Sequence, residues 1–124
     1  MALFITIALG GALGSLLRFL ISKYIQNKAG LEFPIGTLFV NLTSAFAIGL
    51  AFSLLVEKWD ISPNLRALII TGILGGYSTY STLFYEAFYL LINGELVKFS
   101  LYILLSNLLG LFFVALGYGF GKLL

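Results

Sequence analysis

The chain has 124 residues, of which 60% are hydrophobic and only 10% are charged, and its formal net charge is +2. About a quarter of the residues of a soluble domain are charged, so this composition excludes an ordinary soluble protein and predicts one membrane-embedded unit over residues 1–124. The chain lacks cysteine and histidine, which excludes disulfides, thiolate metal sites and imidazole bases. Its low net charge argues against a nucleic-acid partner. The sequence also shows no nucleophile–base pair that would indicate an enzyme.

Four apolar segments are long enough to cross a membrane, since a spanning helix needs about 20 apolar residues. The first runs from Ala2 to Tyr24 and lacks the pattern of a cleavable signal peptide. The others run from Ile35 to Val56, from Leu65 to Ile92 and from Leu96 to Phe120. The short joining segments predict a single all-α unit of four transmembrane helices.

The first span contains a pair of small residues and a charge. Gly10 and Gly14 form a GxxxG pair, which permits the close approach of another helix. Arg18 follows four residues later, and a charge within a span usually faces the bundle interior or a wet cavity. Its long side chain could instead extend to the membrane surface near Lys23, so both positions are left open.

The second span presents a small and partly polar face. Thr37, Asn41 and Ser44 recur along it at helical spacing. The side chain of an asparagine offers two N–H donors and one acceptor oxygen. Asn41 is therefore expected either to hydrogen-bond a neighbouring helix or to direct a donor into a path for an anion.

In the third span, Gly75 and Gly76 precede a run of hydroxyl residues. Because glycine lacks the Cβ that favours a continued helix, we expect the helix to break at this pair. The break would leave carbonyl groups that attract a cation on one side and N–H groups that attract an anion on the other. A simple kink whose backbone groups are satisfied by hydroxyl side chains is the alternative.

Beyond the break, Tyr80, Leu83 and Phe84 fall on a shared stripe of the third span. An aromatic stripe in a membrane helix usually faces lipid or packs against protein. However, the edge of an aromatic ring is positive and can contact a small anion. The rings of Tyr80 and Phe84 are therefore candidates to line a path for an anion.

Further polar side chains lie in the last two spans. Tyr102 and Ser106 share one face of the fourth span, where their hydroxyl groups would face a pore. Glu86 is the carboxylate deepest within a span. It is expected to pair with Arg18 or Lys98, or to lie at a pore mouth.

The basic residues give no preferred orientation in the membrane. Four spans place Lys58, Arg66 and Lys122 on the side of the two termini, against Lys23, Lys28 and Lys98 on the other. Since an excess of Lys and Arg marks cytoplasmic loops, this equal count indicates either a noisy signal or insertion in both orientations. Two opposed copies could then pair about an axis in the membrane plane.

Taken together, the motifs resemble the Fluc family of fluoride channels, also known as CrcB. The matching blocks are Gly10-Gly11…Gly14…Arg18, Gly36-Thr37-Leu38-Phe39-Val40-Asn41 and Gly75-Gly76-Tyr77-Ser78-Thr79-Tyr80-Ser81-Thr82. The resemblance covers essentially the whole chain. It implies an antiparallel, dual-topology dimer in a bacterial cell membrane, surrounded by lipid, with two fluoride pores and a structural Na+ ion at the interface.

The resemblance also assigns roles to residues. Those it implies along the pore are Thr37, Asn41, Tyr80, Ser81 and Leu83. The backbone carbonyls of Gly75 and Ser78 match the sodium-binding positions of the family. Arg18 and Glu86 match its two charges, as vestibule or structural groups.

Three positions depart from the family pattern. Tyr80 replaces a phenylalanine but keeps a ring, Leu83 removes the second ring, and Ser44 stands where the pattern has glycine. Phe84 points about 100° away from Leu83 on a helix. The loss at Leu83 allows two hypotheses: a conducting channel, or a non-conducting subunit that pairs with a paralogue.

The expected function is passive fluoride export. Hydrogen fluoride enters a cell as a neutral acid and dissociates there, and an inside-negative potential drives the anion out with about 2.3 kcal/mol per 100 mV. A small multidrug exporter, which also has four helices and dual topology, is a further alternative. That class needs a carboxylate in its first span, where this chain has Arg18.

Overall fold

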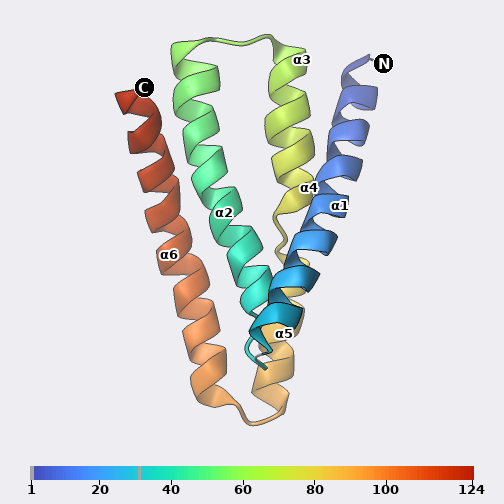
Figure 1. Ribbon diagram of the computed structural model, residues 1–124, viewed down its shortest axis with the longest axis vertical. Helices are drawn as coiled ribbons and strands as arrows, with labels where there is room; N and C mark the ends of the chain where they lie inside the picture. Colours follow the sequence, from blue (N-terminus) through green and yellow to red (C-terminus); the bar gives the residue numbers. More distant parts are fainter. Residues whose placement is uncertain (1, 31) are drawn as a thin grey trace.

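The computed structural model describes residues 2–30 and 32–124 of the chain. In that part of the chain, four helical spans are long and apolar enough to cross a membrane, as predicted. They cover Ala2–Ala29, Ile35–Lys58, Pro63–Ile92 and Leu96–Leu123. Figure 1 shows the spans running up and down, with both chain ends and α3 at one end of the molecule. The predicted all-α fold with four spans is confirmed.

Two of the spans are built from more than one helix. The helices in chain order are α1 (Ala2–Ala29), α2 (Ile35–Ala51), the π-helix η1 (Phe52–Lys58), α3 (Pro63–Arg66), the π-helix η2 (Ala67–Leu74), α4 (Gly75–Tyr77), α5 (Ser81–Ile92) and α6 (Leu96–Leu123). The third span starts at Pro63, because the Ser62 side chain accepts the N–H of Leu65 at 3.3 Å and proline is tolerated in the first helical turn.

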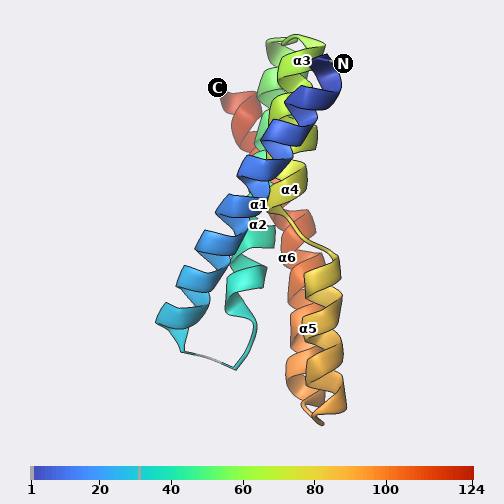
Figure 2. The ribbon, with the colours of Figure 1, turned by 90° about the vertical axis from the view of Figure 1, so that its right-hand side faces the viewer.

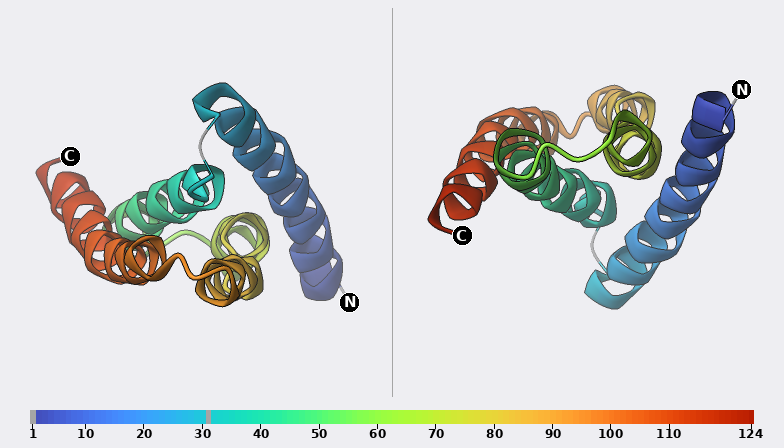
Figure 3. Two further views of the ribbon diagram at one scale, coloured as in Figure 1. Left: turned by 90° about the horizontal axis from the view of Figure 1, so that it is seen from below. Right: turned by 90° about the horizontal axis from the view of Figure 1, so that it is seen from above.

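Helices α2 and α6 pack together through glycine. A Cβ at Gly49 would collide with the carbonyl oxygen of Val114, and a Cβ at Gly117 would collide with that of Phe46. Only residues without a side chain permit such an approach of two backbones. Figure 3 shows α1 on one flank of the molecule and α6 on the opposite flank, with the other spans between them.

Helix α1 packs against the first half of the third span. A Cβ at Gly10 would lie 2.7 Å from the carbonyl oxygen of Leu68, and a Cβ at Gly14 would lie 2.9 Å from the amide nitrogen of Tyr77. The close approach predicted for the Gly10–Gly14 pair is therefore confirmed, and its partner is the segment formed by η2 and α4.

The second half of the third span packs on the other side of the molecule. Its side chains join α2 and α6 in a buried apolar cluster of Leu38, Leu83, Ala87, Leu90 and Tyr102. Many of the remaining large apolar side chains of the described residues face outward, as helices in contact with lipid require. The protein core is therefore small and is centred on α5.

The third span is interrupted between α4 and α5, as Figure 2 shows. Helical geometry continues through Gly75 and Gly76, and the chain first becomes extended at Ser78, with φ −76° and ψ 158°. The prediction of a broken third helix is confirmed, but the predicted place, the glycine pair, is wrong. A Cβ at Gly76 would lie 2.6 Å from the Gly11 carbonyl oxygen, so this glycine serves packing rather than interruption.

Candidate functional site

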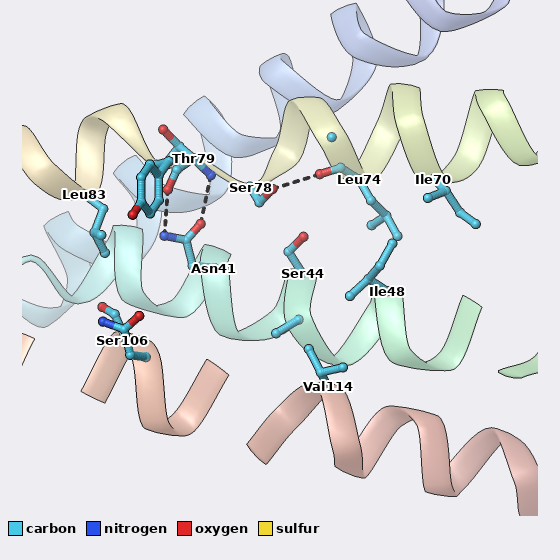
Figure 4. Close-up of a pocket in the computed structure, with 14 residues that line it drawn as sticks. Asn41, Ser44, Ile48, Ile70, Leu74, Ser78, Thr79, Leu83, Ser106 and Val114 are labelled. Atoms are coloured by element: carbon cyan, nitrogen blue, oxygen red, sulfur yellow. Dashed lines mark hydrogen bonds between the residues drawn. The ribbon is translucent and has the colours of Figure 1, made fainter. Parts of the chain in front are cut away.

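The interruption is held by the side chain of Asn41, which reaches it from α2. The Asn41 Nδ2 group donates to the Thr79 carbonyl oxygen at 2.9 Å, and the Thr79 N–H donates to Asn41 Oδ1 at 2.9 Å. Figure 4 shows both bonds. One side chain thus satisfies both backbone groups of a residue that has left the helix, as backbone groups inside a membrane require.

Two further contacts hold the end of α4. The Arg18 Nε group donates to the Gly76 carbonyl oxygen at 3.2 Å, and the hydroxyl groups of Thr43 and Tyr77 are hydrogen-bonded at 2.9 Å. A cation next to the last carbonyl groups of a helix is favourable for its dipole. The structure therefore places the partly buried Arg18 against the end of α4, next to the break.

At the break, two carbonyl groups lose the N–H donors that a continued helix would give them. In a continued helix, the Thr79 N–H would bind the Gly75 carbonyl, but it binds Asn41. The Thr82 N–H would bind the Ser78 carbonyl, but it donates to Thr79 Oγ1 at 3.4 Å. Gly75 and Ser78 are the two positions that the family resemblance matches to sodium, and carbonyl oxygens are suitable ligands for that hard cation.

An open cavity of about 440 Å³ lies beside the break, between the second, third and fourth spans. None of the fourteen described residues that line it is charged. Its polar side chains are Asn41, Ser44, Ser78, Thr79, Tyr80, Ser106 and Asn107. The Ser106 Oγ atom is buried and has no hydrogen-bond partner among the described residues. A neutral cavity rich in N–H and O–H donors can surround a small anion without trapping it.

The cavity brings together only part of the predicted pore. Lining residues from that set are Asn41, Tyr80, Leu83 and Ser106, together with Gly75 and Ser78. Four other predicted positions lie outside its lining: Thr37, Ser81, Phe84 and Tyr102. Ser81 is exposed at the start of α5.

Thr37 and Tyr102 belong instead to a second polar cluster around Glu86. The Tyr102 side chain is fully buried within the protein and its hydroxyl donates to Glu86 Oε1 at 2.9 Å, while Thr37 lines a small cavity together with Glu86. Glu86 also lines two smaller cavities of about 310 and 230 Å³, near the loop between α1 and α2. The predicted position of Glu86 at a pore mouth stays a prediction.

The predicted pairing of Glu86 with Arg18 or Lys98 is wrong. Arg18 is bound to the Gly76 carbonyl, and the Lys98 ammonium group lies 3.2 Å from Glu32 and 3.4 Å from Glu95. Both cations have nearer partners because α1 faces the end of α4, whereas the start of α6 faces the loop before α2.

The two positions considered for the second aromatic ring behave differently. Leu83 is only 5% exposed and packs in the apolar cluster on α5. Phe84 forms an edge-to-face pair with Tyr80, with ring centroids 4.5 Å apart and an interplanar angle of 89°. Tyr80 is 73% exposed. The chain thus keeps two adjacent rings after the break, at positions 80 and 84.

Two residues that hold the backbone near the site were not predicted from the sequence. Thr79 acts through its backbone, which the sequence alone does not connect to Asn41. Gln26 holds the entry to α2: its Nε2 group donates to the Phe33 carbonyl at 3.0 Å, and its Oε1 atom accepts the Gly36 N–H at 3.0 Å. In both cases an amide side chain binds backbone groups of another segment, for which the amino-acid sequence carries no signal.

Comparison with known proteins gives matches along nearly the whole chain. The sequence model of the family described as "CrcB-like protein, Camphor Resistance (CrcB)" matches residues 5–118. Relatives named "Fluoride-specific ion channel FluC" include one from Aquifex aeolicus that is 54% identical over 98% of both chains. Another, from Thermus thermophilus, is 45% identical over 95% of this chain and 94% of that one. The matched range contains the whole third span, including its break.

Proposed function

The chain belongs to the CrcB family, and from this premise we propose that it is a subunit of a fluoride-selective channel through which fluoride leaves the cell passively. The observation that carries the proposal is the interrupted third span, which Asn41 clamps beside a cavity lined by neutral donors. Full-length relatives named as fluoride-specific ion channels support the same conclusion. These names indicate an ion channel rather than an enzyme.

Selection for fluoride follows from the kind of donors that surround the cavity. Fluoride is small and strongly hydrated, so a path must replace its water with closely spaced donors. The Asn41 amide, the ring edge of Tyr80 and the Ser106 hydroxyl, which has no partner among the described residues, are such donors on the lining. The absence of a cation from the described lining keeps binding weak enough for release.

The functional unit that we propose is an antiparallel dimer in the cell membrane, formed with a second copy or with a paralogue. Its support is the equal number of Lys and Arg residues on the two sides and the open, partly apolar cavity that one subunit leaves uncovered. The exposed ring of Tyr80 beside that cavity gives a second subunit a large apolar surface to cover.

A sodium ion would lie where the two breaks cross. Each subunit would supply the carbonyl oxygens of Gly75 and Ser78, whose helical N–H donors are diverted to Asn41 and Thr79. Two opposed copies would then offer four oxygens to one ion. When bound, the ion would balance the carbonyl dipoles and tie the two subunits together.

Fluoride efflux from liposomes tests the function. The purified chain, reconstituted alone, is expected to release fluoride at a rate far above that of chloride under the same potential, as measured with ion-selective electrodes. Equal fluxes of the two anions would contradict fluoride selectivity. Replacement of external and internal sodium by N-methylglucamine is expected to lower the flux if the sodium proposal is right.

A non-conducting partner of a paralogue is the second candidate, because Leu83 lacks the ring that the family pattern has at this position and is buried in the core. The same liposome experiment separates the two. If the chain alone gives no fluoride flux but raises the flux of a co-reconstituted paralogue, the second candidate is correct.

A further inference from the structure

We propose that Ser44 contacts the permeating anion directly, and that its hydroxyl continues the donor path where the donors of α6 end. The inference rests on the proposed fluoride function and deepens it. Ser44 is the position at which this chain departs from the glycine of the family pattern, so its hydroxyl is a group that the resemblance does not explain.

The Ser44 side chain is buried at 5% exposure, yet it lines the 440 Å³ cavity. Figure 4 shows it pointing from α2 towards Ser78 and Leu74 in the third span. Among the described residues, its hydroxyl makes no hydrogen bond. Other hydroxyl residues of the same span bind their own backbone: Thr43 donates to the Phe39 and Val40 carbonyls, and Ser53 donates to that of Leu50.

Most polar side chains around the cavity are already engaged. Asn41 binds Thr79, Ser78 Oγ donates to the Leu74 carbonyl at 3.2 Å, and Asn107 Nδ2 donates to the Ile103 carbonyl at 2.7 Å. Among the described residues, the serine hydroxyls without a hydrogen-bond partner on the α2 and α6 walls are those of Ser44 and Ser106.

The α6 wall has donors over only part of its length. Tyr102 and Ser106 lie one turn apart, but the next two positions on the same face are Gly110 and Val114, which have no side-chain donor. An anion that leaves Ser106 in this direction meets apolar surface on α6. Ser44, on the α2 wall of the same cavity, then offers the donor that α6 lacks.

We assign the Ser44 hydroxyl to the anion because the proposed cation already has oxygen ligands, whereas the anion lacks donors beyond this point. Two carbonyls per subunit, those of Gly75 and Ser78, already provide oxygen ligands, whereas past Ser44 the cavity wall continues with Ala45, Ile48 and Val114. Without Ser44, a small anion would lose its water there without a replacement donor, and its passage would slow.

The test compares Ser44→Ala with the matched control Ser53→Ala, both in the full-length chain reconstituted in liposomes. Ser53 is on the same span, is also buried and lies outside the cavity. Ser44→Ala is expected to lower fluoride flux about ten-fold, as the loss of one hydrogen bond to a charged group predicts. Ser53→Ala should conduct like the natural chain, and Ser44→Thr should restore most of the flux because it restores the hydroxyl.

Thermal unfolding and gel-filtration profiles of all variants establish that they are folded. A Ser44→Ala variant that conducts like the natural chain would overturn the proposal. So would a flux loss that is repaired by raised sodium, because that would assign Ser44 to the cation. If the natural chain itself carries no fluoride, the proposed function fails first, and the role of Ser44 fails with it.

Discussion

The two halves of the third span are anchored to different partners by different means. The first half, η2 with α4, meets α1 through backbone contacts that only glycine permits, at Gly10, Gly14 and Gly76. The second half, α5, is held to α2 and α6 by buried side chains such as Leu83 and Tyr102. Between the halves, the Asn41 side chain holds the chain by two hydrogen bonds to Thr79. The break thus separates two segments of one span that pack against different helices.

The largest effect is expected when the Asn41 side chain, which holds the interruption between the two halves, is removed. Asn41→Ala leaves both backbone groups of Thr79 without partners, which we expect to cost about 3 kcal/mol of folding free energy and to lower fluoride flux at least ~100-fold. Liposome efflux and thermal unfolding measure the two effects. The control is Asn93→Ala at the exposed end of α5, which should change neither. Near-natural flux in Asn41→Ala would show that the clamp is dispensable.

A cavity introduced into the second half should weaken the packing of α5 against α2 and α6 and lower the stability of the protein. Leu83→Ala removes a side chain that is 5% exposed, and such truncations cost about 2–4 kcal/mol. The thermal midpoint in detergent is the measurement. Leu83→Phe provides the sharper comparison: if position 83 serves packing as the structure places it, the larger ring should also destabilise the protein, by about 1–3 kcal/mol. If Leu83→Phe instead increased the fluoride flux without loss of stability, position 83 would line the pore rather than serve packing.

The first half should be sensitive to added volume rather than to lost volume. In Gly76→Ala the new Cβ would lie 2.6 Å from the Gly11 carbonyl oxygen, so α1 must move and we expect a loss of about 1–2 kcal/mol. Gly11→Ala is the matched control, because a Cβ there meets nothing within 4 Å. Equal thermal midpoints for the two variants would argue against backbone packing as the anchor of the first half.

The smallest effect is expected where a charge caps the first half. Arg18→Gln removes the cation that binds the Gly76 carbonyl, which should cost about 1 kcal/mol. Arg18→Lys keeps the charge and should retain more of the stability. If both variants unfold at the same temperature as the natural chain, Arg18 does not stabilise the end of α4, and its contact with Gly76 is incidental.

The amino-acid sequence by itself determined the four spans, the common side of both termini and the close contact through Gly10 and Gly14. These features follow from hydrophobic length and from residue size, which are local properties that add up along the chain. The broken third span was also predictable, because glycine and hydroxyl residues interrupt an otherwise apolar segment.

Only the tertiary structure decided where the break lies and which residues hold it. The interruption falls at Ser78 because Asn41, from another span, captures Thr79, and Gly76 stays helical because α1 approaches it. In the same way, Glu86 binds Tyr102 and not a cation, since α6 lies nearer to it than Arg18. Inside a membrane each polar group must find a partner within the protein, and which partner it finds depends on which spans are neighbours.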